Sequence, residues 1–140
     1  KFDKQIYSTF LSFLPEKKFL ITFKKNEDKR GNFSELLKSK INGQISFCSI
    51  NPGQTRGNHF HFTKVERFFA LSGKGKIIYK NIYNEKQKIY TFDYKKPLIF
   101  ETIPGWSHKL VNTSKSVAIF VLWTNEIFDI KKPDTYFYRI

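Results

Sequence analysis

The sequence lacks several features that would define its class at once. It has a single cysteine, Cys48, and no methionine, and its 12 acidic residues face 25 basic ones. With one cysteine no internal disulfide can form, and no apolar run approaches the roughly 20 residues that a membrane-spanning helix needs. We therefore exclude a disulfide-stabilised scaffold and membrane insertion. We expect a reducing, cytoplasmic location.

The N-terminal residues show neither an initiator nor a secretion leader. Residues 1–25 contain no clean apolar core followed by a small-residue cleavage site. A chain without methionine is expected to be a fragment or a processed product. We predict that residues 1–18 are a lead-in, with a short helix before Pro15, from a missing N-terminal domain. Residues 19–140 are predicted to form one domain, which suits their number.

The formal net charge is +13, and the basic residues are scattered in pairs such as Lys17-Lys18 and Lys95-Lys96. Such a charge attracts phosphate, in nucleic acid or in a small nucleotide, although a lysine-rich codon bias would give the same composition. No helix-turn-helix, zinc-finger or basic-helix pattern accompanies it. We therefore predict no nucleic-acid partner.

Short apolar and aromatic segments, separated by turn residues, fill the chain after residue 18. Strands of five to eight residues with turn signals every 8–12 residues are typical of a β-sandwich or barrel. The first strand is predicted at Phe19–Phe23. The most apolar segment, Ser116–Thr124, is predicted to lie at the centre of a sheet. The predicted fold class is all-β, a jelly-roll barrel with a short N-terminal lead-in and a C-terminal tail, Asn125–Ile140.

All three histidines fall within one spaced pattern. It reads Gly53-x5-His59-x-His61-x4-Glu66-x6-Gly73, followed by Gly105-x2-His108-x3-Asn112. Residues i and i+2 of a strand lie on the same side, about 7 Å apart, so His59 and His61 can converge on one ion. We expect Glu66 to return on the neighbouring strand and His108 to come from elsewhere in the sheet.

These four side chains, His59, His61, Glu66 and His108, are the predicted metal ligands. Imidazole and carboxylate suit Zn, Fe, Mn or Ni, and this donor set does not select among them. The alternative is a barrel without metal, in which the same residues are polar lining and a histidine acts as a base.

The two patterns resemble the two motifs of the cupin superfamily, whose fold is a double-stranded β-helix. The second motif departs from the usual form at Ile103, where a proline is common, although Pro104 still precedes Gly105. A closer resemblance, over nearly the whole chain, is to the C-terminal cupin domain of CapF-type capsule-synthesis enzymes. The segments that carry it include Arg56-Gly57-Asn58-His59-Phe60-His61 and Pro133-Asp134-Thr135-Tyr136.

The resemblance implies an activity, a cofactor and a partner. It implies an enzyme that epimerises C3 of a UDP-linked 4-keto-6-deoxy-2-acetamido sugar, of the UDP-N-acetyl-fucosamine type, for bacterial surface polysaccharide. It further implies zinc and a homodimer. The reductase domain of that family uses NADPH, but no Gly-x-Gly-x-x-Gly is found here, so we expect no NADP in this fragment. Two alternatives remain open: another metal cupin, such as an Fe(II) dioxygenase, or a non-catalytic module for sugar-nucleotide binding or dimerisation.

Inversion at C3 requires an acid and a base on opposite faces of the sugar ring. Lys64, in the turn between His61 and Glu66, is the first candidate for one of these roles, and its alternative is a solvated loop lysine. His108 is a second candidate, and Tyr79 and Tyr90 are further possible acids.

Two more residues are candidates for substrate binding. Arg56 can grip the diphosphate, because its guanidinium matches phosphate oxygens, and its alternative is a surface salt bridge. Trp106 can stack on the sugar or the uracil, and its alternative is a hydrophobic plug at the barrel rim.

Overall fold

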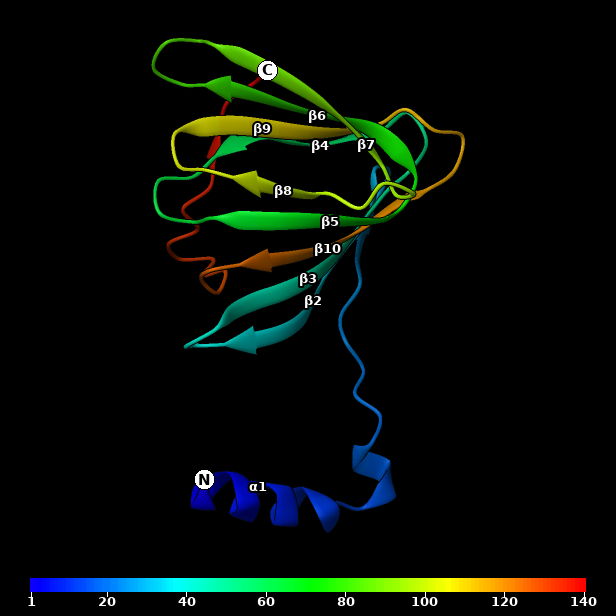
Figure 1. Ribbon diagram of the computed structural model, residues 1–140, viewed down its shortest axis with the longest axis vertical. Helices are drawn as coiled ribbons and strands as arrows, with labels where there is room; N and C mark the ends of the chain where they lie inside the picture. The colour runs from blue at the N-terminus through cyan, green and yellow to red at the C-terminus, as the bar shows by residue number, and fades with distance from the viewer.

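A computed structural model describes all residues, 1–140, and shows two antiparallel sheets packed face to face (Figure 1). The first sheet contains, in spatial order, β1 (Asn26–Asp28), β2 (Gly31–Ser39), β3 (Gly43–Ile50), β10 (Ala118–Thr124), β5 (Glu66–Ser72) and β8 (Ile99–Thr102). The second contains, in spatial order, β11 (Tyr136–Phe137), β4 (Thr55–Phe60), β9 (Trp106–Asn112), β6 (Lys74–Asn81) and β7 (Gln87–Asp93).

The strand pairs are nested around one hairpin. β6 pairs with β7, β5 with β8, β4 with β9 and β3 with β10. A chain paired in this way is one long hairpin rolled so that its successive strand pairs fall alternately in the two sheets. That is the jelly-roll topology, so the predicted all-β fold class is confirmed.

The core lies between the sheets and is filled by alternate residues of each strand. In β10 the buried positions alternate with partly exposed ones, and Phe120 is fully buried. It packs with residues of both sheets, among them Ile50, Ile77 and Leu110. β10 lies between β3 and β5, which confirms the prediction that the most apolar segment is central.

The N-terminal residues lie apart from the barrel. The helix α1 (Phe2–Ser12) and the 3₁₀ turn η1 (Glu16–Lys18) bury no side chain, and an extended segment joins them to β1 (Figure 1). The strand predicted at Phe19–Phe23 is wrong, because its residues pair with no strand and remain exposed. Apolar and aromatic composition alone does not make a strand where no neighbour supplies the ladder hydrogen bonds. None of the helices has the length and apolar character needed to cross a bilayer.

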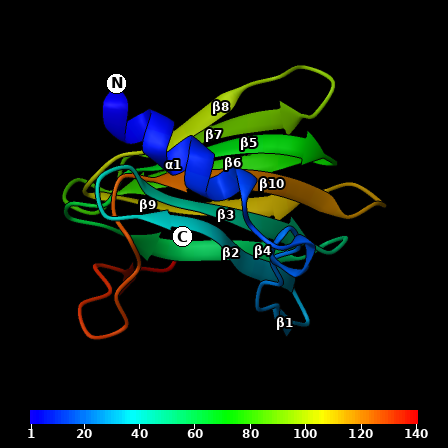
Figure 2. The ribbon, with the colours of Figure 1, turned by 90° about the horizontal axis from the view of Figure 1, so that it is seen from below.

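The chain after β10 covers one end of the sandwich. After β10 it passes from the first sheet to the second across the end at which the β4–β5 connection lies (Figures 1 and 2). Its short strand β11 pairs with β4 through Tyr136↔Phe60 and Phe137↔His59. The segment therefore lies beside the two histidines of the first motif.

Candidate metal centre

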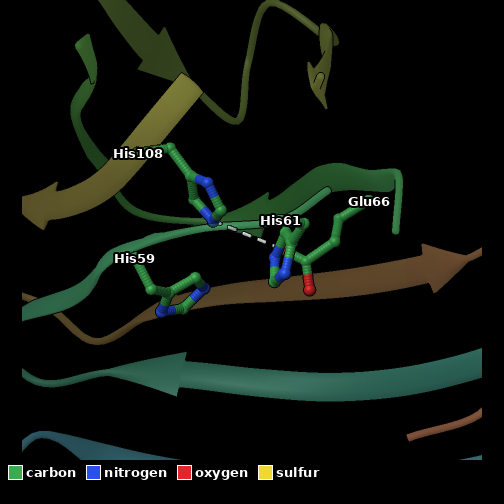
Figure 3. Close-up of side chains that lie close together, drawn as sticks. All are labelled: His59, His61, Glu66 and His108. Atoms are coloured by element: carbon green, nitrogen blue, oxygen red, sulfur yellow. Dashed lines mark ion pairs between the residues drawn. The ribbon is translucent and has the colours of Figure 1, made fainter. Parts of the chain in front are cut away.

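The four predicted ligands converge at one place between the sheets (Figure 3). One potential ligand atom from each of His59, His61, Glu66 and His108 lies within 4.8 Å of the other three. His61 and His108 are almost fully buried, at 3% and 1% exposure, whereas His59 is partly exposed. The cluster therefore has an enclosed side and an open side, as a site that admits a small molecule needs.

The elements that supply these ligands differ from the sequence-based expectation. Glu66 does not return on the strand next to β4, because β5 belongs to the opposite sheet. His108 is the residue on the neighbouring strand, directly paired with His59. His61 lies just beyond the end of β4. The strand pairing of a jelly roll explains why Glu66 and His108 have exchanged their expected places. Strands that are consecutive in sequence, such as β4 and β5, fall in different sheets, and strands that are distant in sequence, such as β4 and β9, become neighbours.

A bulge in β4 sets the direction of His59. The register between β4 and β9 shifts between Gly57 and His59, and Asn58 has a φ of 63°. A bulge of this kind bends the strand and re-aims the side chain that follows it. Gly57 has a φ of 111°, and a Cβ there would collide with the main-chain carbonyl of His108. The glycine therefore permits the close approach that brings His59 and His108 together.

The polar atoms of the cluster fit a cation better than they fit one another. Glu66 Oε2 lies 3.3 Å from His61 Nε2 and 3.2 Å from His108 Nε2, but neither contact has hydrogen-bond geometry, and both Glu66 Oε2 and His61 Nε2 lack a partner. Buried polar atoms without partners are rare and call for an explanation. A cation bound among these ligand atoms would be that explanation, so the chemistry and the arrangement of the residues fit a metal ion.

Electrostatics keeps His59 and Glu66 in the forms that bind metal. Burial, with a smaller repulsion from His108, lowers the pKa of His59 to about 3, so its imidazole is neutral at physiological pH. Burial raises the pKa of Glu66, but the two adjacent imidazoles outweigh it and hold that pKa below its usual range. A neutral imidazole and an ionised carboxylate are the species that coordinate metal.

Lys64 is buried beside the cluster rather than solvated in a loop. It is 5% exposed, and its ammonium donates to the carbonyl of Pro133 at 3.0 Å and to Thr135 Oγ1 at 3.2 Å. The amine also lies over the ring of Phe128, 5.6 Å from its centroid. Lys64 lines a cavity of about 300 Å³ together with His59, His61 and Glu66.

Arg56 borders a second cavity, of about 270 Å³, that reaches the cluster from the barrel interior. Its side chain is only 13% exposed. It donates to the carbonyl of Ser49 at 3.2 Å and to Asp28 Oδ1 at 3.3 Å. Asp28 also accepts two hydrogen bonds from the guanidinium of Arg30, which lines the same cavity. The structure therefore adds Arg30 to the predicted Arg56 as a second cation near the metal ligands.

Trp106 lies in a different hollow. It lines a larger one, about 690 Å³, with Tyr79 and Tyr90, and none of the four predicted ligands contributes to it. Tyr79 donates its hydroxyl hydrogen to the carbonyl of Glu101. The size of this hollow does not make it the reaction site, because the metal-type ligands border the two smaller cavities. Substrate binding by Trp106 stays a prediction.

Asp134 is the site residue that reasoning from spacing missed. Its carboxylate accepts hydrogen bonds from the main-chain N–H groups of Phe62, Thr63 and Lys64, and its own carbonyl lies 2.6 Å from His61 Nδ1. Seventy or more residues separate it from these partners. The Pro133-Asp134-Thr135-Tyr136 stretch of the family resemblance was the one signal that pointed to it.

The fold is that of a cupin, and the cluster is a candidate metal site within it. The family described as "Polysaccharide biosynthesis C-terminal domain" matches residues 26–136. The chain belongs to this family.

Two relatives resemble nearly the whole chain. A Pseudomonas aeruginosa protein named UDP-2-acetamido-2,6-beta-L-arabino-hexul-4-ose reductase is 40% identical over 133 residues, which are 95% of this chain and 36% of that protein. The crystal structure of the capsular polysaccharide assembling protein CapF from Staphylococcus aureus is 37% identical, with a TM-score of 0.93 over 99% of this chain and 40% of CapF. The chain thus spans well under half the length of either relative.

A more distant likeness supports the fold alone. Oxalate decarboxylase from Lactobacillus farciminis matches 74% of this chain and 31% of its own, at 18% identity and a TM-score of 0.65. The barrel is therefore shared with proteins of other activities, and function has to be argued from the site.

Proposed function

We propose that this chain is a zinc-dependent cupin that inverts C3 of a UDP-linked 4-keto-6-deoxy-2-acetamido sugar in the synthesis of a surface polysaccharide. The observation that carries the proposal is the cluster of three imidazoles and one carboxylate beside two cavities lined by cationic side chains, of which Lys64 is buried. The name of the Pseudomonas relative, a UDP-4-ulose reductase, supports the substrate class.

Epimerisation beside a ketone is a proton exchange. The C3–H bond breaks, its electron pair is delocalised to the C4 carbonyl oxygen, and a proton returns to C3 on the opposite face without net oxidation or reduction. A divalent ion, when bound, supplies the Lewis acidity that stabilises the negative oxygen, an effect worth several kcal/mol. The chain must then provide proton carriers and hold the substrate.

Lys64 is the proposed carrier of one of these protons. Its amine is buried at the edge of the cavity that the ligands line, and one carbonyl and one hydroxyl hold it there. Neither partner is a carboxylate, so the amine is not held in an ion pair and can exchange a proton with substrate. His108 is the second candidate, but its burial and its contact with Glu66 favour a ligand role.

Arg56 and Arg30 are proposed to hold the diphosphate. Both guanidiniums border the interior cavity and share one carboxylate, that of Asp28. Glu66 also lines that cavity, so the two guanidiniums face two carboxylates, and a bound divalent ion would leave the charge there net positive, which favours an anionic group. Arginine suits this role because its fixed fork of N–H donors matches phosphate oxygens.

Deuterium exchange tests the function. The zinc-loaded chain is incubated with the UDP-4-keto sugar in deuterated water, and deuterium at C3 is measured by NMR and mass spectrometry. We expect exchange that depends on metal and that falls at least about 100-fold in Lys64→Met, the range of general acid–base catalysis. Lys131→Met, a loss of an exposed lysine from the C-terminal region, should exchange as the unchanged protein does.

The outcomes separate the competing functions. Exchange no faster than in the metal-free control would overturn the epimerase. Oxygen consumption with bound iron would favour a dioxygenase, and binding of the UDP-sugar without exchange would favour a non-catalytic module.

A further inference from the structure

Residues 133–140, called the C-terminal segment from here on, contact His59 and His61 and the residue next to His108. Its residue Asp134 meets the connection that follows His61, and its strand β11 pairs Phe137 with His59. Next to His108, the hydroxyl of Ser107 donates to the carbonyl of Tyr138 at 2.7 Å. A segment so placed is able to control the geometry of the ligands without being a ligand itself.

The carboxylate of Asp134 holds the connection between His61 and Glu66. Oδ1 accepts from Phe62 N at 3.0 Å, and Oδ2 accepts from Thr63 N and Lys64 N, both at 2.9 Å. The hydroxyl of Thr63 adds a fourth hydrogen bond at 3.0 Å. Three consecutive main-chain N–H groups gathered on one carboxylate leave this loop little freedom, because hydrogen bonds to a charged acceptor are the strong ones.

The main-chain carbonyl of the same residue fixes His61. His61 Nδ1 lies 2.6 Å from Asp134 O, and a carbonyl can only accept, so the proton lies on Nδ1. Nε2 is thereby left with its lone pair, and it lies 3.3 Å from Glu66 Oε2 without a hydrogen-bond partner. Asp134 thus determines both the orientation of the ring and the nitrogen that faces the metal position.

The backbone of Asp134 is strained in a way that these contacts explain. Its φ is 32°, in the left-handed region that costs a residue with a side chain free energy. In this conformation its carbonyl points at His61, and its carboxylate accepts hydrogen bonds from the main chain of residues 62–64. A conformation of this kind persists only where surrounding contacts enforce it, and such positions cluster at functional sites.

We propose that Asp134 is a positioning residue for the metal ligand His61: its carboxylate anchors the loop 62–64, and its carbonyl selects the tautomer that coordinates. The proposal rests on the metal site of the proposed function, but it does not depend on the sugar or the reaction. It assigns a role to a residue that is not one of the four predicted ligands and belongs to neither histidine motif.

The test compares two substitutions with one control. Asp134→Gly removes the carboxylate and tolerates the positive φ, so that it tests the anchor without adding strain. Asp134→Asn keeps the shape and one acceptor oxygen. Asp129→Ala removes an exposed carboxylate from the same tail, where its side chain accepts only from Lys131 N. Zinc affinity is measured by competition with a chromogenic chelator, and the visible spectrum of the Co²⁺-loaded protein reports ligand geometry.

We expect Asp134→Gly to weaken zinc binding by about 10–100-fold, the usual cost of losing a residue that orients a ligand. Asp134→Asn should fall between it and the unchanged protein, and both should alter the Co²⁺ spectrum at saturation. Asp129→Ala should change neither. A purely structural role would instead lower the melting temperature of the metal-free protein and leave the affinity and the spectrum intact.

Each result decides the matter. A folded Asp134→Gly variant with unchanged zinc affinity and Co²⁺ spectrum overturns the positioning role while leaving the metal site standing. If Asp134→Gly does not fold, the same comparison is made with Asp134→Asn. An unchanged protein that binds no metal overturns both this role and the proposed function, whereas metal binding without C3 exchange overturns the function alone.

Discussion

Removal of one ligand should uncouple the stability of this domain from metal. His61→Ala deletes a donor whose Nε2 has no partner within the protein. A metal that binds only the folded state, at a free concentration about 100-fold above its Kd, stabilises by about 2.7 kcal/mol. In a domain of about this size each kcal/mol raises the Tm by roughly 4 °C, so zinc should raise the Tm of the unchanged protein by about 10 °C. We expect His61→Ala to lose most of that rise.

The substitution also affects the metal-free protein, so a double difference is needed. His61 donates one hydrogen bond, to Asp134, and its loss costs about 1 kcal/mol or somewhat more with the space that the ring vacates. All three histidines of the chain belong to the cluster, so none can serve as a matched control. The zinc-induced rise in Tm is therefore measured for each protein against its own chelator-treated sample by differential scanning calorimetry.

The measurement can refute the reasoning in two ways. If the Tm of the unchanged protein is the same with zinc, cobalt, nickel, manganese or iron as with chelator, the buried atoms without hydrogen-bond partners do not mark a metal site. If His61→Ala shows the full rise, the metal binds elsewhere. Metal content by elemental analysis should agree, with about one ion per chain in the unchanged protein and a substoichiometric amount in the variant.

Two further predictions concern the barrel around the cluster. Gly57→Ala should lower the free energy of unfolding by more than about 1 kcal/mol and weaken zinc binding. The reason is that the added Cβ collides with the carbonyl of His108 and forces β4 away from β9. A variant with unchanged zinc affinity and unchanged Tm would contradict this interpretation of the bulge. Hydrogen bonds from Arg30 lower the pKa of Asp28 to about 2, from 3.8 in an unfolded chain. The stability that this carboxylate provides is therefore present above about pH 4 and lost as pH falls toward 2, and urea unfolding should show a smaller loss over that range in Asp28→Asn.

The strands and the clustered ligands could be predicted from the sequence, because both have local signals. Apolar positions and turn residues locate a strand closely: the predicted Ser116–Thr124 begins two residues before β10 and ends at the same residue. The histidine spacing identified residues that the structure brings together. Phe19–Phe23 carries the same composition and fails as a strand, since pairing depends on a neighbour that composition does not specify.

The assignment of each ligand to a sheet could not be predicted from the sequence, and the reason is physical. Spacing places His61 and Glu66 close in sequence, and closeness in sequence suggested adjacent strands. In a jelly roll the chain crosses to the other sheet between them, so Glu66 faces the histidines across the core. The contact between Asp134 and residues 62–64 closes a loop of about 70 residues, and no local pattern predicts a contact over that separation.

The charges around the cluster bear on the kind of molecule that it accepts. Among the side chains that line the two cavities or pair with a lining residue, cations outnumber carboxylates by four to three: Arg30, Lys38, Arg56 and Lys64 against Asp28, Glu35 and Glu66. With His59 neutral, a bound divalent ion would leave this region net positive. An excess of charge is costly where it is partly buried, as it is at Glu66 and Lys64, unless a counter-charge accompanies it. An anionic ligand provides that counter-charge, so the electrostatics supports a diphosphate-bearing substrate over a neutral sugar. The prediction is measurable, since UDP should then bind the metal-loaded protein more tightly than the metal-free form.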